Sequence, residues 1–210
     1  MLCGIAVMVA GMAAAACGHG MLWEPPNRGS LWRFGYETPV NYDDNAQFCG
    51  GFQAQWQKNG GRCGECGDDY SLERPRPQEN GGEFGLAVIA ATYERASVIN
   101  ATALITANHM GYFVFRLCPL EEEGQLETEE CFSKWPLSLT DGSTEYVLPS
   151  NDTGYYSVEL QLPEDLECKQ CVLQWTYVAG NNWGVCDDGT QGLGCGPQET
   201  FRTCTDIAIA

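Results

Sequence analysis

The sequence predicts an all-β protein, an antiparallel β-sandwich whose long loops are held by disulfide bonds. Two observations predict this class. Short apolar stretches rich in β-branched and aromatic residues recur beyond residue 84, with turn residues between them. Cysteines are numerous, 12 in 210 residues, so disulfides can order the irregular segments of the chain. The length suits one medium-sized domain, and no domain boundary stands out after residue 18.

The region from His19 to about Glu83 is expected to be irregular. It is dense in glycine, proline, asparagine and aromatic residues, and turn signals such as Pro25-Pro26-Asn27 interrupt it. No apolar stripe with helical spacing crosses it. A segment of this length without secondary structure needs another source of order, and the three cysteines within it would supply that order.

Beyond Glu83 the pattern changes to strands. Apolar and polar residues alternate between residues 156 and 162, the period of a half-buried strand, and the other stretches are β-branched and apolar. Strands are expected at residues 85–93, 97–106, 111–117, 156–162, 172–178 and 201–209. Six or more short strands with long loops favour an antiparallel sandwich of the immunoglobulin or fibronectin type III kind.

Residues 1–18 have a composition of their own and are expected to form a secretory signal peptide. They carry no charged side chain, and the apolar run from Ile5 to Cys17 is shorter than the roughly 20 residues that cross a bilayer. Ala16 and Gly18 place small residues at positions −3 and −1 of a cut before His19. The alternative is a buried hydrophobic strand or helix. After the cut, residues 19–210 would be a secreted, single-domain protein beginning with histidine.

The cysteines agree with export. Two of the 12 lie within residues 1–18, and the even set of ten that remains predicts up to five disulfides, whose pairing the spacing does not reveal. Zinc is the alternative for two C-x-x-C pairs, but these lie about a hundred residues apart, against roughly 15–20 in a zinc ribbon. The ten are Cys49, Cys63, Cys66, Cys118, Cys131, Cys168, Cys171, Cys186, Cys195 and Cys204. Sequons at Asn100 and Asn151 would accept glycans in a secretory pathway.

The charge excludes some partners. The chain has 28 acidic and 11 basic side chains, a net charge of −17. Such a surface repels phosphate backbones and anionic lipid, so neither nucleic acid nor a membrane is an expected partner. A neutral partner or a cation is compatible with it.

Histidine occurs only twice, at His19 and His109. After the expected cut, the α-amine and the imidazole Nδ1 of His19 could chelate a metal together. One further imidazole would complete a T-shaped set of three nitrogens, and His109, in a break between two predicted strands, is the one available. Such a set favours copper over magnesium, calcium or structural zinc. The alternative for His109 is an ordinary surface or hydrogen-bonded histidine.

The segments around these histidines resemble those of lytic polysaccharide monooxygenases, most closely auxiliary activity family 15. The matching pieces run in family order over nearly the whole mature chain. They are His19-Gly20-Met21-Leu22, Pro25, Arg28, Ser30, Trp32-Arg33, Asn41-Tyr42, Phe48 to Phe52, Cys63 to Asp68, Ala107-x-His109, Leu173 to Gly184 and Glu199 to Ile207.

The resemblance implies roles for six residues. His19 and His109 match the copper-binding histidine brace. Phe201 matches the axial position near the metal, where it would supply no oxygen donor; a strand residue facing the core is the alternative. Ala107 matches a small residue that shapes access to the copper.

Two further positions have weaker matches. Glu199 matches a polar position that would hydrogen-bond an oxygen species at the metal, and an exposed acidic residue is its alternative. Tyr42 is a candidate aromatic contact with a polymer, and packing within a loop or the core is its alternative.

The resemblance also implies the reaction. One copper ion per chain would cycle between Cu(II) and Cu(I), with electrons from an external small-molecule or protein donor and with hydrogen peroxide or dioxygen as co-substrate. The oxidant would act at C1 or C4 beside a glycosidic bond of an insoluble polysaccharide, chitin first and cellulose next. The expected oligomeric state is a monomer.

Other classes of protein are compatible with parts of the sequence. A polysaccharide-binding protein or a copper-handling protein of the same fold would lack the reaction, and a glycoside hydrolase would use paired carboxylates, of which the chain has many candidates. A disulfide-rich structural or inhibitory protein is the least specific alternative. The chain contains no G-x-S-x-G elbow, P-loop or dinucleotide-binding fingerprint.

Overall fold

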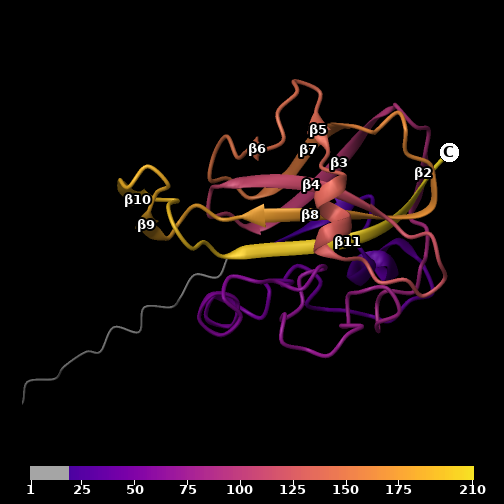
Figure 1. The fold of residues 1–210 in the computed structure, drawn as a ribbon, viewed down its shortest axis with the longest axis horizontal. Helices are drawn as coiled ribbons and strands as arrows, with labels where there is room; N and C mark the ends of the chain where they lie inside the picture. The colour runs from indigo at the N-terminus through magenta and orange to yellow at the C-terminus, as the bar shows by residue number, and fades with distance from the viewer. Residues whose placement is uncertain (1–18) are drawn as a thin grey trace, which may run out of the picture.

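Two β-sheets face each other and enclose the main hydrophobic core (Figure 1). The structure is a computed structural model in which residues 19–210 are described, so the predicted signal peptide lies outside the described residues. The sandwich fold predicted from the sequence is confirmed.

The first sheet contains four strands, all antiparallel to their neighbours. Their order is β1 (His19–Glu24), β3 (Val98–Ala107), β7 (Gly154–Gln161) and β5 (Ser138–Leu139). Strand β1 lies at one edge of this sheet, and its first residue is His19.

The second sheet contains five strands. Their order is β2 (Ala91–Tyr93), β11 (Thr200–Ile209), β8 (Cys168–Val178), β4 (Tyr112–Pro119) and β6 (Tyr146–Val147). Strands β11, β8 and β4 are long and antiparallel, whereas β2 pairs with β11 in parallel. The prediction of a strand at 85–93 is therefore wrong for residues 85–90, since only the last three residues form the strand β2.

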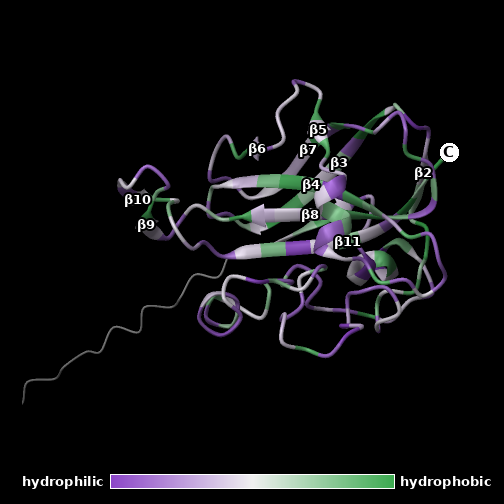
Figure 2. Ribbon diagram, in the orientation of Figure 1, coloured by the Kyte–Doolittle hydropathy of each residue, from purple (hydrophilic) through white to green (hydrophobic). Residues whose placement is uncertain are grey.

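Alternation along the strands builds the core. Ile99, Ala101, Ala103 and Ile105 of β3 are buried and point into the sandwich, while the residues between them are partly or fully exposed. Large rings of the second sheet meet them: Phe113, Trp175, Tyr177 and Phe201 are all fully buried. Figure 2 shows the apolar character of the strands against the polar loops below them.

The prediction of an irregular segment from His19 to about Glu83 is wrong at three places. Strand β1 pairs with β3, and two short helices follow, the 3-10 helix η1 (Arg28–Phe34) and the π-helix η2 (Gln53–Lys58). Neither helix is long enough to show an amphipathic period. The rest of the segment runs as loops beneath the second sheet (Figure 1).

Three smaller elements complete the chain. Helix α1 (Glu129–Lys134) starts where the Thr128 side chain accepts a hydrogen bond from the backbone N–H of Cys131, a normal N-cap. Strands β9 (Trp183–Val185) and β10 (Gln191–Leu193) form a hairpin that projects from one end of the sandwich (Figure 1). No helix among residues 19–210 is long and apolar enough to cross a membrane.

All ten cysteines of the described chain are paired, which confirms the disulfides and settles their connectivity. The pairs are Cys49–Cys63, Cys66–Cys204, Cys118–Cys131, Cys168–Cys171 and Cys186–Cys195. The Cys66–Cys204 bond ties the N-terminal loops to β11 across 138 residues of sequence. The zinc alternative fails, because each C-x-x-C cysteine is committed to a disulfide.

A buried ion network lies beside that disulfide. The Arg28 guanidinium donates to both carboxylate oxygens of Asp206, at 2.7 and 2.8 Å, and to Glu127. All three side chains are at most 1% exposed. Charges this deep are tolerated only when they are paired and hydrogen-bonded, so the network fixes helix η1 and the 120–128 loop against β11.

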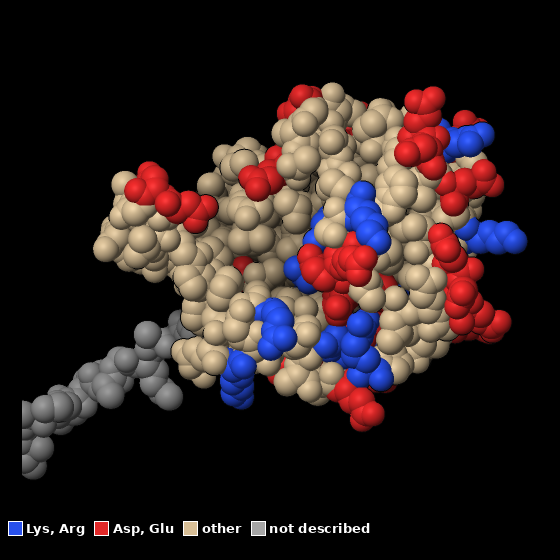
Figure 3. Space-filling view, viewed as in Figure 1, with Lys and Arg blue, Asp and Glu red and all other residues tan. Residues whose placement is uncertain are grey.

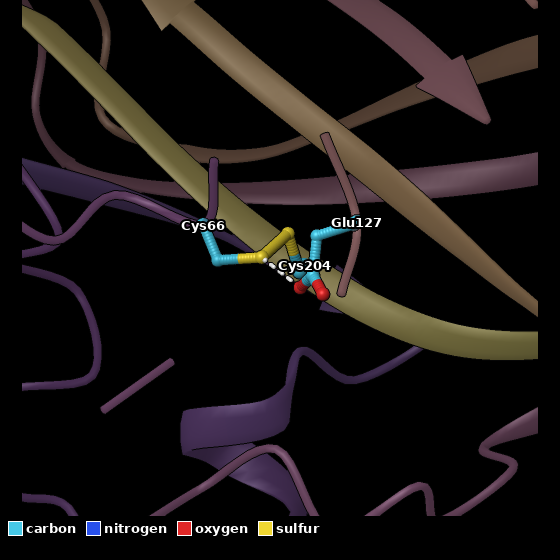
Figure 4. A group of neighbouring side chains, drawn as sticks. All are labelled: Cys66, Glu127 and Cys204. Atoms are coloured by element: carbon cyan, nitrogen blue, oxygen red, sulfur yellow. Dashed lines mark hydrogen bonds between the residues drawn. A yellow bond between two sulfur atoms is a disulfide. The ribbon is translucent and has the colours of Figure 1, made fainter. Parts of the chain in front are cut away.

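Figure 4 shows Glu127 beside the Cys66–Cys204 bond. Their ligand-type atoms lie within 4.8 Å of one another. The two sulfurs are bonded to each other and Glu127 already accepts hydrogen bonds from Arg28 and the Asn80 backbone, so this cluster is structural.

Candidate functional site

The register of the first sheet brings the two histidines to one end of the sandwich. His19, the first residue of β1, lies opposite Ala107, the last residue of β3. His109 follows two residues later in the loop between β3 and β4. The two histidines that the sequence singled out are thus neighbours in the fold, although 90 positions separate them in the chain.

Backbone contacts with β8 hold the His109 loop in place. The His109 N–H donates to the Tyr177 hydroxyl at 2.9 Å, and the His109 carbonyl accepts from the Gly180 N–H at 2.9 Å. The loop turns at Gly111, where φ is 91° and a Cβ would come within 2.0 Å of the Val178 carbonyl oxygen. A glycine is required there for the loop to approach β8 so closely.

Two side chains face the His109 imidazole at Nδ1. The Asn181 side-chain amide lies 2.7 Å from Nδ1, and Glu199 Oε2 lies 3.8 Å from the same atom. With Nδ1 engaged by Asn181, Nε2 is the ring nitrogen left to act as a ligand. An outer partner of this kind fixes both the tautomer and the ring orientation of a metal-binding histidine.

The Phe201 ring lies beside the His19 ring, with ring centroids 6.2 Å apart. It is fully buried and stacks on Tyr177 at 5.7 Å, so it occupies both environments predicted for it, the core and the neighbourhood of the histidine. Burial raises the pKa of the Tyr177 hydroxyl to about 12, so this group stays protonated at neutral pH.

The remaining predicted positions divide into two groups. Ala107 and Glu199 lie at the histidines, and Glu199 is only 9% exposed, which excludes its alternative as an exposed acidic residue. Tyr42 is 80% exposed and contacts the edge of Trp32 at 5.5 Å, so it is a surface residue and not part of the core. The sequon residues Asn100 and Asn151 are both exposed.

Tyr177 and Asn181 are the two site residues to which sequence analysis gave no role. Both lie in the matched segment from Leu173 to Gly184, but a motif position does not say which side chain contacts a ligand. Their contacts with His109 depend on how β8 crosses the β3–β4 loop, and no local pattern in the sequence encodes that crossing.

The donor set at this end of the molecule fits copper. The available atoms are imidazole nitrogens and, in a chain that starts at His19, a primary amine, which are ligands that suit Cu(II). The only other convergent group of ligand-type side chains within residues 19–210 is the disulfide-bonded one described above.

Comparison with known proteins agrees with this chemistry. The family model described as "Lytic polysaccharide mono-oxygenase, cellulose-degrading" matches residues 19–207. The chain therefore belongs to the lytic polysaccharide monooxygenases, which are copper-dependent enzymes that cleave polysaccharides oxidatively.

Among solved structures, a lytic polysaccharide monooxygenase of family AA15 from Thermobia domestica, in its Cu(I) state, is 51% identical. The match covers 91% of this chain and 99% of that one, with a TM-score of 0.89. The predicted resemblance to family AA15 is confirmed.

Two more distant structures also match. The cellulose-active, copper-bound enzyme CelS2 is 15% identical, over 90% of this chain and 98% of that one, with a TM-score of 0.44. LPMO10B from Micromonospora aurantiaca is 12% identical, over 90% and 99%, with a TM-score of 0.43. A comparison with curated protein sequences gave no significant match.

Proposed function

We propose that His19 and His109 together hold one copper ion, through the α-amine and Nδ1 of His19 and through Nε2 of His109. The pairing of His19 with Ala107 carries this proposal, because His109 lies only two residues beyond Ala107 in the chain. The family match, which begins at residue 19, supports it. The bound copper supplies one-electron redox chemistry, with an external donor as reductant and dioxygen or hydrogen peroxide as co-substrate.

The surrounding side chains orient these ligands. Asn181 holds the His109 ring by Nδ1, and Tyr177 holds the backbone of the same residue. The Phe201 ring lies 6.2 Å from the His19 ring and has no ligand atom, so this residue would add no donor to the nitrogens of the two histidines. Glu199 Oε2 lies 3.8 Å from Nδ1 of His109, and the role proposed for it is to exchange a proton with the oxygen co-substrate. The role proposed for the small side chain of Ala107 is to leave room beside the metal.

The proposed substrate is chitin, and cellulose is the second candidate because the family model is described as cellulose-degrading. Both polymers are uncharged, which suits a protein with a net charge of −17. The exposed ring of Tyr42 is a candidate contact with the polymer.

The mature protein is proposed to be a secreted monomer. Five disulfides support export, since such bonds persist in oxidising compartments. The proposal includes removal of residues 1–18 and a single catalytic domain at 19–210, with glycans accepted at Asn100 and Asn151.

The decisive experiment uses protein that starts at His19 and is loaded with one equivalent of copper. It is incubated with chitin or with cellulose, with and without ascorbate, and soluble products are identified by mass spectrometry. Oxidised oligosaccharides that require ascorbate are expected, and the mass and position of oxidation distinguish C1 from C4 attack. Non-oxidised products without ascorbate would instead indicate a hydrolase.

A matched control blocks the α-amine of His19 by acetylation. The chelating amine becomes an amide, so Cu(II) affinity should fall strongly, and ascorbate-dependent cleavage should fall with it. Equal Cu(II) affinity of the two forms in a competition titration would contradict the proposed ligand set.

A further inference from the structure

A groove opens on the outer face of the second sheet, on the side away from the core. Its volume is about 760 Å³, within the usual range for small-molecule sites. Strands β4, β8 and β11 form its floor, and Trp56, Glu129 and the segment 194–198 form its walls. Figure 3 shows it as a hollow between the projecting β9–β10 lobe and the charged side chains at the centre of the face.

The groove is separate from the copper site although both use β11. Successive residues of a strand point to opposite faces. Phe201 points inward to His19 and Tyr177, whereas Thr200 and Arg202 point outward and line the groove.

Arg116 and Arg202 both line the floor of the groove, and Arg202 is the one without a carboxylate at hydrogen-bond distance. Its Nε donates to the Thr176 hydroxyl at 3.2 Å, and its Nη1 lies 3.9 Å from Glu129 Oε2, beyond hydrogen-bond distance. No other ion pair of its guanidinium occurs within residues 19–210. Its side chain is only 15% exposed, so Arg202 is a mostly buried cation with an incomplete set of acceptors.

The nearest acidic groups are engaged elsewhere or lie at the rim. Glu129 accepts two hydrogen bonds from Arg116, one of them at 3.0 Å, and thereby neutralises that arginine. Glu65 pairs with Arg76 at 2.7 Å. Glu145 is exposed at the edge of the groove.

The pKa of Arg202 reflects the shortage of acceptors around its buried guanidinium. Burial, together with the nearby Arg116 charge, lowers it to about 10. An anion placed at the terminal nitrogens of Arg202 would therefore relieve an existing cost, in a protein whose surface is otherwise strongly acidic.

The chemistry of the lining defines the ligand. A guanidinium fork matches a carboxylate in a bidentate manner. Trp56 and Tyr112 offer apolar ring surfaces. The side chains of Gln198 and Thr200 also line the groove, but they are already hydrogen-bonded within the protein. We propose that this groove binds a small organic acid, with the carboxylate on Arg202 and the remainder of the molecule against Trp56 and Tyr112.

The test is isothermal titration of the copper-loaded protein at low salt with two acids and one neutral probe. 4-Hydroxybenzoate presents a flat ring, D-gluconate presents a polyol, and 4-hydroxybenzamide keeps the ring without the charge. Saturable one-to-one binding of at least one acid is expected. The acid that binds more tightly shows whether the groove prefers a flat ring or a polyol beside the carboxylate. If it prefers the ring, the benzamide should bind at least about tenfold more weakly than 4-hydroxybenzoate.

Variants assign the binding to the groove. Arg202→Gln should weaken the acid at least about tenfold, while Arg95→Gln, which removes an equal charge at an exposed position, should leave it unchanged. Arg202→Lys keeps the charge but not the fork, and it serves as the second variant if the glutamine protein does not fold. The electron paramagnetic resonance spectrum of the copper should not change on binding.

Three results would overturn the proposal. They are the lack of saturable binding by either acid, equal acid affinity of the wild-type protein and both Arg202 variants, and a ligand-induced change in the copper spectrum that assigns the binding to the metal. None of these depends on whether the protein cleaves chitin or cellulose.

Discussion

The Asn181 side-chain amide lies 2.7 Å from Nδ1 of His109, and the backbone of the preceding Gly180 donates to the His109 carbonyl. One short segment after β8 therefore fixes both the ring and the main chain of the second histidine. The orientation of His109 is set by this segment and not by the loop to which His109 belongs.

Replacing Asn181 with alanine removes the partner of Nδ1 and frees the ring to rotate. Loss of such a partner weakens metal binding by about 10–100-fold, and we expect this loss for Cu(II), with altered hyperfine splitting in the copper spectrum. A competition titration measures it. Asn182→Ala is the matched control, since among residues 19–210 the one hydrogen bond of that side chain is to the Pro197 carbonyl, at 3.4 Å. Equal affinities of the two variants would show that Asn181 has no positioning role.

Replacing Tyr177 with phenylalanine keeps the ring stacked on Phe201 and removes only the acceptor for the His109 N–H. The free energy of unfolding should fall by about 1–2 kcal/mol, the cost of leaving a largely buried N–H without its partner. Urea unfolding of the metal-free protein measures it. Tyr155→Phe, at a position that is 62% exposed, should change it little, and a similar loss in both variants would contradict the expectation.

Replacing Arg28 with methionine leaves Glu127 and Asp206 buried without their common partner. Removing one partner of a buried ion pair typically costs 3–5 kcal/mol, so a loss of about that size is expected in thermal or urea unfolding. Lys134→Met is the control, because the Lys134–Glu130 pair is exposed and should contribute well under 1 kcal/mol. A loss below 1 kcal/mol for the Arg28 variant would mean that the network is not a structural anchor.

Asp68 should make the fold less stable as the pH rises. Burial raises the pKa of its carboxyl to about 6, above the ordinary value of 3.8, so the folded protein holds this proton more tightly than the unfolded chain. Stability from this group is full below about pH 4 and is lost as the pH rises to 6, by at most about 3 kcal/mol.

Asp68→Asn tests this pH dependence, because an amide oxygen can still accept from the Gln78 N–H. The variant should unfold at a higher temperature than the wild type at pH 8 and at a similar temperature at pH 4. Asp43→Asn, at an exposed position, should show no such crossover. A constant difference between the Asp68 variant and the wild type at the two pH values would contradict the assignment.

The long strands were predictable because their residues carry their own period. Apolar and polar residues alternate from Tyr156 to Leu162, and β7 covers most of this run. Strand β1 was not predicted because it shows no alternation of apolar and polar residues. Gly20, Met21 and Leu22 are buried in succession, and two prolines follow directly after the strand. Its identity as a strand comes from pairing with β3, far away in the sequence.

The two histidines could be predicted because histidine is rare in this chain and His19 follows an expected cleavage site. The positions of Phe201, Ala107 and Glu199 came only from resemblance to a family. The roles of Asn181 and Tyr177, and the groove around Arg202, depend on which strands cross and which faces they present. Those relations exist only after the two sheets have formed.

Strand β11 has a consequence for how this protein can change over generations. Phe201 points inward to the histidine end of the core, while Thr200 and Arg202 point outward into the groove. A substitution at position 200 or 202 can therefore reshape the groove without altering the inward surface, so natural selection can act on each nearly independently. Related chains should then share the inward residues of this strand, together with Cys204 and Asp206, while positions 200 and 202 diverge.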